Sequence, residues 1–109
     1  MPAVVKPSLV VKYVALPTLL EFKAYIHAAL CGLDHLDVAQ SPMTVTVLLR
    51  RGVPCGYHFC VQGPRLLRNS AIWSSSDNRV LLYGSTGARV GELHLTEAPE
   101  LVTPLGAAA

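Results

Sequence analysis

TVTVLLRRGVPCGYHFCVQGPRLLRNSAIWSSSDNRVLLYGSTGARVGELHL, residues 44–95, decides the fold of this 109-residue chain. Its short segments rich in β-branched and aromatic residues predict strands, and the Gly, Pro, Asn, Asp and Ser residues between them predict turns. Because the connections are too short to hold crossover helices, we expect neighbouring strands to pair antiparallel, as a meander. The predicted strands span residues 43–50, 55–62, 65–73, 79–84 and 89–95.

Alternation along these segments assigns side chains to the two faces of the sheet. In the second strand Tyr57, Phe59 and Val61 share one face, while His58 and Cys60 share the other. A single helix can cover only one face, yet apolar residues occur on both. We therefore expect the second face to be covered near its centre. The apolar residues expected there are Leu48, Leu66, Ile72 and either Val80 with Leu82 or Leu81 with Tyr83.

A helix is predicted from about Thr18 to Cys31. Thr18 and Glu21 have the spacing of a capping box, in which the Thr hydroxyl accepts from the Glu amide and the Glu side chain reaches back. Apolar residues then recur every three or four positions and form one stripe. Gly32 is the predicted terminator, because glycine adopts a positive φ without a Cβ penalty. The stripe consists of Leu19, Phe22, Ile26, Ala29, Leu30 and Leu33.

The segments that flank the helix are less regular. Residues 9–15, LVVKYVA, have strand propensity and form either an edge strand or an extended arm. Residues 34–43 form a polar connection that can hold a turn of helix or a short extended piece. We expect residues 1–8 and 99–109 to be flexible or docking tails. The prediction is a single α+β domain over residues 1–109, with one amphipathic helix packed on an antiparallel meander of about five strands.

The composition is apolar for so small a domain. Residues of the types AVILMFWYC make up 51% of the chain and charged residues only 15%, against about 25% charge in ordinary globular proteins. So few charges predict a second buried surface, and we expect a homo-oligomer, most simply a dimer. No apolar run reaches the roughly 20 residues needed to span a bilayer, so we expect no membrane segment. The three cysteines favour reduced thiols and a cytoplasmic location.

The segment CGYHFC, residues 55–60, raises the question of metal or thiol chemistry. Zinc needs converging ligands, but Cys55 and Cys60 fall on opposite faces of a regular strand unless Gly56 introduces a bulge. His58 and Cys60 share a face about 6.6 Å apart, at roughly 3.3 Å per residue, which is loose for a catalytic pair. We favour structural thiols, and we expect no metal, no cofactor and no catalytic residue.

The stretch GSTG, residues 84–87, has the composition of a phosphate-binding loop. Such a loop leads into a helix, whose amino end supplies the amides that hold the phosphate. Here the residues that follow, ARVGELHL, alternate as a strand does. We therefore expect a hairpin turn.

Arginine is the most informative polar residue of the predicted sheet. Residues 44–95 contain six arginines against one Asp and one Glu, a balance of +4, and most of the arginines lie at strand ends or turns. A nucleic-acid surface would place them beside exposed aromatic side chains, whereas Tyr57, Trp73 and Tyr83 fall among apolar neighbours. Small anionic ligands are another class of partner for the same arginines.

These patterns favour a non-catalytic binding or interaction module that forms homo-oligomers. The alternative is a nucleic-acid-binding protein that uses the arginines at the ends of the sheet. No motif in the sequence names a ligand or a partner. The candidate contact residues are Arg50, Arg51, Arg65, Arg68, Arg79, Arg89, His58 and Cys60.

Overall fold

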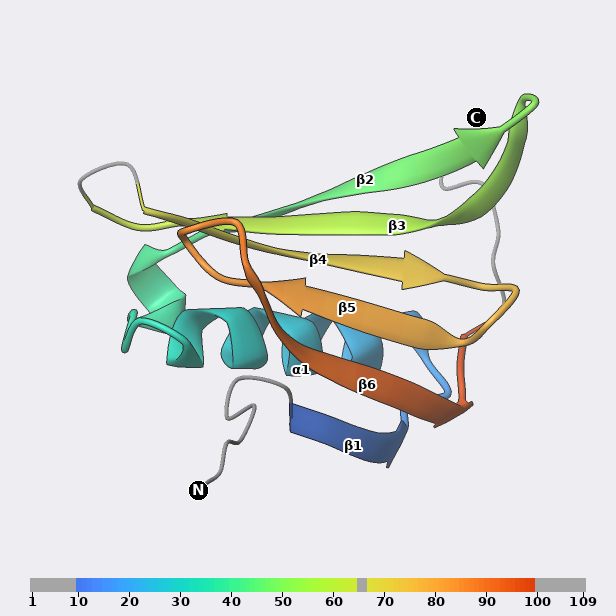
Figure 1. The fold of residues 1–109 in the computed structure, drawn as a ribbon, viewed down its shortest axis with the longest axis horizontal. Helices are drawn as coiled ribbons and strands as arrows, with labels where there is room; N and C mark the ends of the chain where they lie inside the picture. The colour runs from blue at the N-terminus through green and yellow to red at the C-terminus, as the bar shows by residue number, and fades with distance from the viewer. Residues whose placement is uncertain (1–9, 65–66, 100–109) are drawn as a thin grey trace, which may run out of the picture.

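The computed structural model describes residues 10–64 and 67–99, which form one α-helix packed on a six-stranded sheet (Figure 1). The α+β class and the antiparallel meander are confirmed, and the sheet has one strand more than the five predicted. The elements are, in chain order, β1 (Val10–Ala15), α1 (Leu19–Gly32), the 3-10 helix η1 (Val38–Gln40), β2 (Met43–Arg50), β3 (Val53–Gln62), β4 (Arg68–Ser74), β5 (Arg79–Tyr83) and β6 (Arg89–Glu97).

The strand order across the sheet is β1-β6-β5-β4-β3-β2. Strands β2 to β6 pair antiparallel with their neighbours in sequence, because each connection between them is a short turn. Strand β1 is the sixth strand and pairs parallel with β6, with Val10 opposite Gly91 and Tyr13 opposite His94. Of the two alternatives for residues 9–15, the edge strand is therefore the one that forms from Val10 onward.

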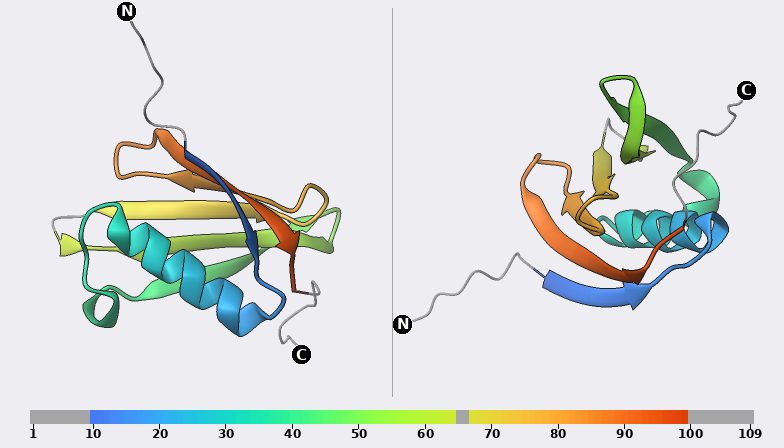
Figure 2. Two further views of the ribbon diagram at one scale, coloured as in Figure 1. Left: turned by 90° about the horizontal axis from the view of Figure 1, so that it is seen from below. Right: turned by 90° about the vertical axis from the view of Figure 1, so that its right-hand side faces the viewer.

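Helix α1 lies on the side toward which the sheet curves (Figure 2). Phe22 of the helix packs edge-on against Phe59 and Trp73, with ring centroids 5.2 and 5.1 Å apart. Val80 and Leu82 also belong to this core, which leaves Leu81 and Tyr83 for the opposite face. The buried apolar residues are Leu16, Phe22, Ile26, Leu30, Cys31, Tyr57, Phe59, Val61, Ala71, Trp73, Val80, Leu82, Leu93 and Leu95.

The start of α1 agrees with the predicted capping box. The Glu21 amide donates to the Thr18 hydroxyl at 3.1 Å, and that hydroxyl donates to the Glu21 carboxylate at 3.0 Å. The predicted terminator is wrong: Gly32 is the last helical residue and lacks a positive φ. The left-handed residue is His35, with φ of 55°, and the Leu36 amide donates to the Cys31 carbonyl at 2.8 Å. This 6→1 bond across a left-handed residue is one of the two hydrogen bonds of a Schellman motif, and it turns the chain away from the helix axis.

Tight turns join β2 to β3 and β5 to β6. The β2–β3 turn places Arg51 and Gly52 at φ of 54° and 80°, the type I′ geometry that matches the twist of the flanking strands. In the stretch Gly84–Gly87 the Gly87 amide donates to the Gly84 carbonyl at 3.0 Å. The Gly84 amide donates to the Ala88 carbonyl, also at 3.0 Å. The stretch is therefore a hairpin turn, as predicted, with β6 directly after it.

Strand β3 contains the bulge that the sequence left open. Leu48 pairs with Gly56 but Leu49 pairs with Pro54, so Cys55 is an extra residue opposite β2. The Cys55 carbonyl instead accepts from the Ser75 amide and hydroxyl, both at 3.0 Å. The bulge bends the hairpin at the end where it extends beyond its neighbours (Figure 1).

A buried amide ties the end of α1 to the sheet. Asn69 of β4 is fully buried, and its Nδ2 donates to the Leu30 carbonyl at 3.0 Å and to the Asp34 carboxylate at 2.8 Å. Charge-assisted hydrogen bonds of this kind hold elements more firmly than neutral ones. The connection after α1 therefore has a fixed position beside β3 and β4.

Candidate binding face

The sheet face opposite α1 is the candidate functional surface, and we call it the open face. Within residues 10–64 and 67–99, α1 packs on the other face and no second helix layer covers this one (Figure 2). Its side chains alternate with the core residues along each strand. They include Thr44, Thr46, Leu48, His58, Cys60, Gln62, Arg68, Ser70, Ile72, Ser74, Arg79, Leu81, Tyr83, Glu92, His94, Val11 and Tyr13.

A pocket of about 350 Å³ lies on the open face over β2, β3 and the start of β4, and we call it the open-face pocket. The strand register explains its lining, because Thr44 pairs with Cys60, and Gln62 with Arg68. Three of the predicted contact residues therefore meet in one place. The lining residues are Pro42, Thr44, Thr46, His58, Cys60, Gln62 and Arg68.

The open-face pocket is rich in hydrogen-bond donors, and none of the described residues that line it is acidic. The Thr44 hydroxyl donates to the Cys60 carbonyl at 3.4 Å. The side chains of Thr46, His58 and Arg68 make no hydrogen bond or ion pair with another described residue. Hydroxyl, imidazole and guanidinium groups are therefore available to a ligand.

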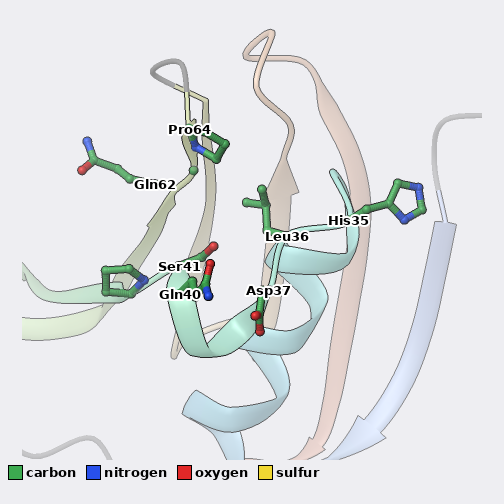
Figure 3. Close-up of a pocket in the computed structure, with 9 residues that line it drawn as sticks. His35, Leu36, Asp37, Gln40, Ser41, Gln62 and Pro64 are labelled. Carbon is green, nitrogen blue, oxygen red and sulfur yellow. The ribbon is translucent and has the colours of Figure 1, made fainter.

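A larger and more open pocket, of about 600 Å³, lies at the end of the sheet beside η1, and we call it the end pocket (Figure 3). It shares Pro42 and Gln62 with the open-face pocket. Its polar side chains do not converge, because His35 and Gln62 point to opposite sides (Figure 3). Leu36 fills the space above Gly63, where an added Cβ would come within 2.9 Å of the leucine side chain.

A third pocket, of about 250 Å³, lies between α1 and the β1–β6 side of the sheet. Tyr25 and Leu33 of the helix and Leu93 of β6 give it an apolar lining, and Lys12 of β1 is the one charged side chain among its described lining residues. A single lysine offers a flexible point charge rather than a fixed set of donors. This third pocket therefore offers fewer polar groups for ligand recognition than the open-face pocket.

On the other side of the open face, Arg79 belongs to a closed network of charges. Its Nη1 and the Nε2 of His94 both lie 2.8 Å from the same Glu92 carboxylate oxygen. The hydrogen bond from Arg79, aided by that from His94, lowers the pKa of Glu92 below its ordinary value. Tyr13 of β1 packs against His94, with the two ring centroids 4.9 Å apart. Arg79 is thus already paired, and the network ties β5 to β6.

The remaining described arginines lie apart from the open-face pocket. Arg50 and Arg51 occupy the tip of the β2–β3 hairpin and are exposed. Arg89 is exposed at the start of β6, at the same end of the sheet as Arg68. Arg65 lies outside the described residues. The structure therefore places Arg68, His58 and Cys60 along one pocket and leaves the other described candidates dispersed.

The threonines, Gln62 and Pro42 are site residues that sequence reasoning missed. Alternation places Thr44 and Thr46 on one face of their strand, which is a real signal. Their position beside His58 and Cys60 depends on the β2–β3 register. Counted from the hairpin turn, the bulge at Cys55 shifts this register by one residue for residues 43–48. That shift cannot be read from the alternation itself.

The cysteines lie apart from one another in reduced form. Cys31 is buried in the core, where burial and then the nearby Asp37 raise the pKa of its thiol, while Cys55 and Cys60 are half-buried. Among the described residues, no three His, Cys, Asp or Glu side chains are close enough to hold a metal ion. Within the same ranges, no helix has the length and apolar character needed to cross a membrane.

Comparison with known proteins finds no family model, no curated protein and no solved structure that matches this chain.

Proposed function

We propose that this protein is a non-catalytic binding module whose open face is its interaction surface, and that it pairs with a second copy through that face. The observation that carries the proposal is the apolar middle of the open face, which we define as Ile72 of β4 and Leu81 and Tyr83 of β5. All three are half-buried, so part of each apolar side chain is accessible to solvent on the open face. Accessible apolar patches on a sheet usually mark contact surfaces in soluble proteins.

A second copy is the occupant that this surface fits best. The chain has 51% apolar residues and only 15% charged ones, which suits a domain with two buried faces. Two segments could cover the open face within the chain, residues 9–15 and residues 99–105. The first pairs in the plane of the sheet at its edge from Val10 onward, and the second lies outside the described residues from position 100 onward. Two-fold pairing of identical faces closes the assembly after two copies.

The geometry gives less support to nucleic acid as the partner. Arg50 and Arg51 lie at one end of the sheet, Arg68 and Arg89 at the other, and Arg79 is neutralised by Glu92. Tyr57 and Trp73 are buried against α1 and offer no surface for base stacking, whereas Tyr83 is half-buried and Tyr13 is exposed on the open face. We also place the protein in the cytoplasm, since its three cysteines are free thiols.

Light scattering coupled to size exclusion tests the proposal. We expect a mass of twice 11.7 kDa that falls toward 11.7 kDa on dilution. Leu81→Lys should shift the mixture to monomer by placing a charge in the apolar middle, while Leu20→Lys, on the exposed side of α1, should leave it unchanged. A mass of 11.7 kDa at every concentration, or equal effects of both variants, contradicts the proposal.

A further inference from the structure

We infer that the outer edge of β2 is a docking site for an extended acidic peptide, which joins the sheet as one more strand. β2 is the last strand in the sheet order, so one of its two sides has no described strand beside it (Figure 1). The inference goes beyond self-association through the open face and does not depend on it.

The hydrogen bonds between β3 and β4 show which way the backbone of β3 points. The Gly63 amide donates to the Leu67 carbonyl at 2.9 Å, just beyond one end of the β3–β4 pair. The Ser75 amide donates to the Cys55 carbonyl at 3.0 Å, at the other end. Because hydrogen-bonded and non-hydrogen-bonded pairs alternate, the odd-numbered residues of β3 bond to β4 and the even-numbered ones bond to β2.

The same alternation identifies the free backbone groups of β2. Thr44 and Thr46 pair with even-numbered residues of β3, so their N–H and C=O groups are used within the sheet. Those of Val45 and Val47 therefore point outward. They make no hydrogen bond with another described residue, and they form the pattern of donors and acceptors to which a further strand can pair.

β2 lacks the features that usually protect an edge strand, which are charges, prolines, bulges or short length. Residues 43–49, MTVTVLL, contain no charge and no proline, and the extra residue of the bulge belongs to β3. The other edge strand, β1, is shorter, carries Lys12 and has a shift of register between Val14 and Ala15. β2 is therefore the edge better suited to accept a strand.

A groove beside this edge has room for side chains of an added strand. α1 packs mainly against β3 and β4, so Val45 and Val47 of β2 remain half-buried. A pocket of about 160 Å³ lies there, and its lining consists of Leu19, Lys23, Val45, Val47 and Tyr57. Every second side chain of an added strand points to this side of the sheet, and we expect small apolar residues at those positions.

The charges beside the edge favour an acidic peptide. Lys23 borders the groove, and Arg50 and Arg51 lie where β2 ends at the hairpin tip. All three are exposed, and none makes an ion pair with a described carboxylate. An extended peptide of six residues is about 20 Å long, so its carboxylates can meet these charges at separate points along β2.

NMR with amide hydrogen exchange on the 15N-labelled full chain tests the inference. The probe is a blocked peptide of alternating valine and aspartate. One control has lysine in place of aspartate, and the other has the same composition with the valines grouped together. We expect the probe to bind at least tenfold more tightly than either control and to slow exchange of the Val45 and Val47 amides. Equal binding of the controls, or binding without slower exchange at these two amides, would overturn the inference.

The protein without peptide tests two other occupants of the edge. We expect the Val45 and Val47 amides to exchange faster than those of Thr44 and Thr46, which bond to β3. Slow exchange at Val45 and Val47 that is lost on dilution would assign the edge to a second copy. Slow exchange at every concentration would assign it to another segment of this chain, and either result refutes the peptide site.

Two substitutions at one position separate strand addition from side-chain contact. Val47→Pro removes an outward N–H without removing a hydrogen bond to β3, and should weaken peptide binding about tenfold. Val47→Ala shortens the same side chain but keeps the N–H, and should weaken binding less. Equal losses in the two variants would contradict strand addition.

Charge variants test the site without altering β2. Lys23→Glu should weaken peptide binding several-fold with unchanged thermal unfolding, because the exposed lysine borders the groove. Arg89→Glu makes the same change of charge on β6, four strands away, and should alter binding less than twofold. Equal losses would show general electrostatic attraction and refute a defined site. Binding of the peptide by monomeric Leu81→Lys would support the edge site even if self-association through the open face fails its own test.

Discussion

At the scale of single residues, Gly56 determines how closely β3 and β4 approach. It pairs with Ser74, and a Cβ built on it would lie 1.9 Å from the Trp73 carbonyl oxygen. The obstacle is backbone, which cannot rotate away as a side chain can. A larger residue therefore has to separate two central strands or widen the bulge at Cys55.

We predict that Gly56→Ala lowers the free energy of unfolding by about 3 kcal/mol, at the upper end of the usual cost of overpacking. Urea denaturation followed by tryptophan fluorescence measures the change, since Trp73 lies beside the site. A loss below 1 kcal/mol would mean that the two strands lie further apart than described.

Some residues could be placed from the sequence and some could not. Alternation correctly assigned Tyr57, Phe59 and Val61 to one face, because that pattern depends only on neighbouring residues. Alternation also puts Asn69 on the same side of its strand as Ala71 and Trp73, but it offers no partner for Asn69. The partners are the Leu30 carbonyl and Asp34, 39 and 35 positions away, which only the tertiary fold brings near.

At the scale of elements, α1 was the easiest to predict and its end was the exception. The Thr18–Glu21 cap is local chemistry and was found from spacing alone. The end depends on where the chain must turn toward β2, and the turn comes at His35 rather than Gly32. A glycine near the end of a helix is therefore only a hint of where left-handed geometry occurs.

This correction predicts a stabilising substitution. Gly32 has ordinary helical geometry, and an added Cβ would meet nothing within 4 Å. Gly32→Ala should therefore raise the free energy of unfolding by about 0.5–1 kcal/mol, because alanine loses less backbone entropy on folding. Chemical denaturation of Gly32→Ala, Gly56→Ala and wild type under the same conditions compares their free energies of unfolding. Destabilisation by Gly32→Ala would restore Gly32 as the left-handed terminator.

The pairing partner of strand β1 could not be predicted from its sequence. The run LVVKYVA indicated extended structure, but propensity carries no information about the partner or its direction. Short turns predicted every antiparallel pair of the meander. The parallel pair of β1 with β6 follows from the crossover through α1, which returns the chain to the far side of the sheet.

At the scale of the whole molecule, the Arg79–Glu92–His94 network should make stability depend on pH. The pKa of Glu92 is lowered in the folded protein, so folding favours its ionised form. That contribution is fully present above the pKa of the unfolded glutamate, about 4.3. It is lost as the pH falls below that value and through the folded pKa.

We therefore predict that the free energy of unfolding falls as the pH is lowered from about 5 toward 3, and that Glu92→Gln reduces this fall. Urea denaturation at a series of pH values measures both slopes. Glu97→Gln is the control, because Glu97 lies exposed on the same strand and makes no described ion pair. An identical slope in wild type and Glu92→Gln would show that other groups cause the acid sensitivity.

The parallel pairing of β1 with β6 also bears on the order in which the chain folds during its synthesis. Val10 and Gly91 are neighbours in the sheet but are separated by 81 positions in the sequence. At about 5–20 residues per second, the ribosome needs roughly 4–16 s to make the second after the first. Throughout that interval β1 has no strand to join, although α1 and the first hairpins can already form. The first of the described strands to be made is thus the last to be paired, and the six-stranded sheet is complete only after β6 has been made.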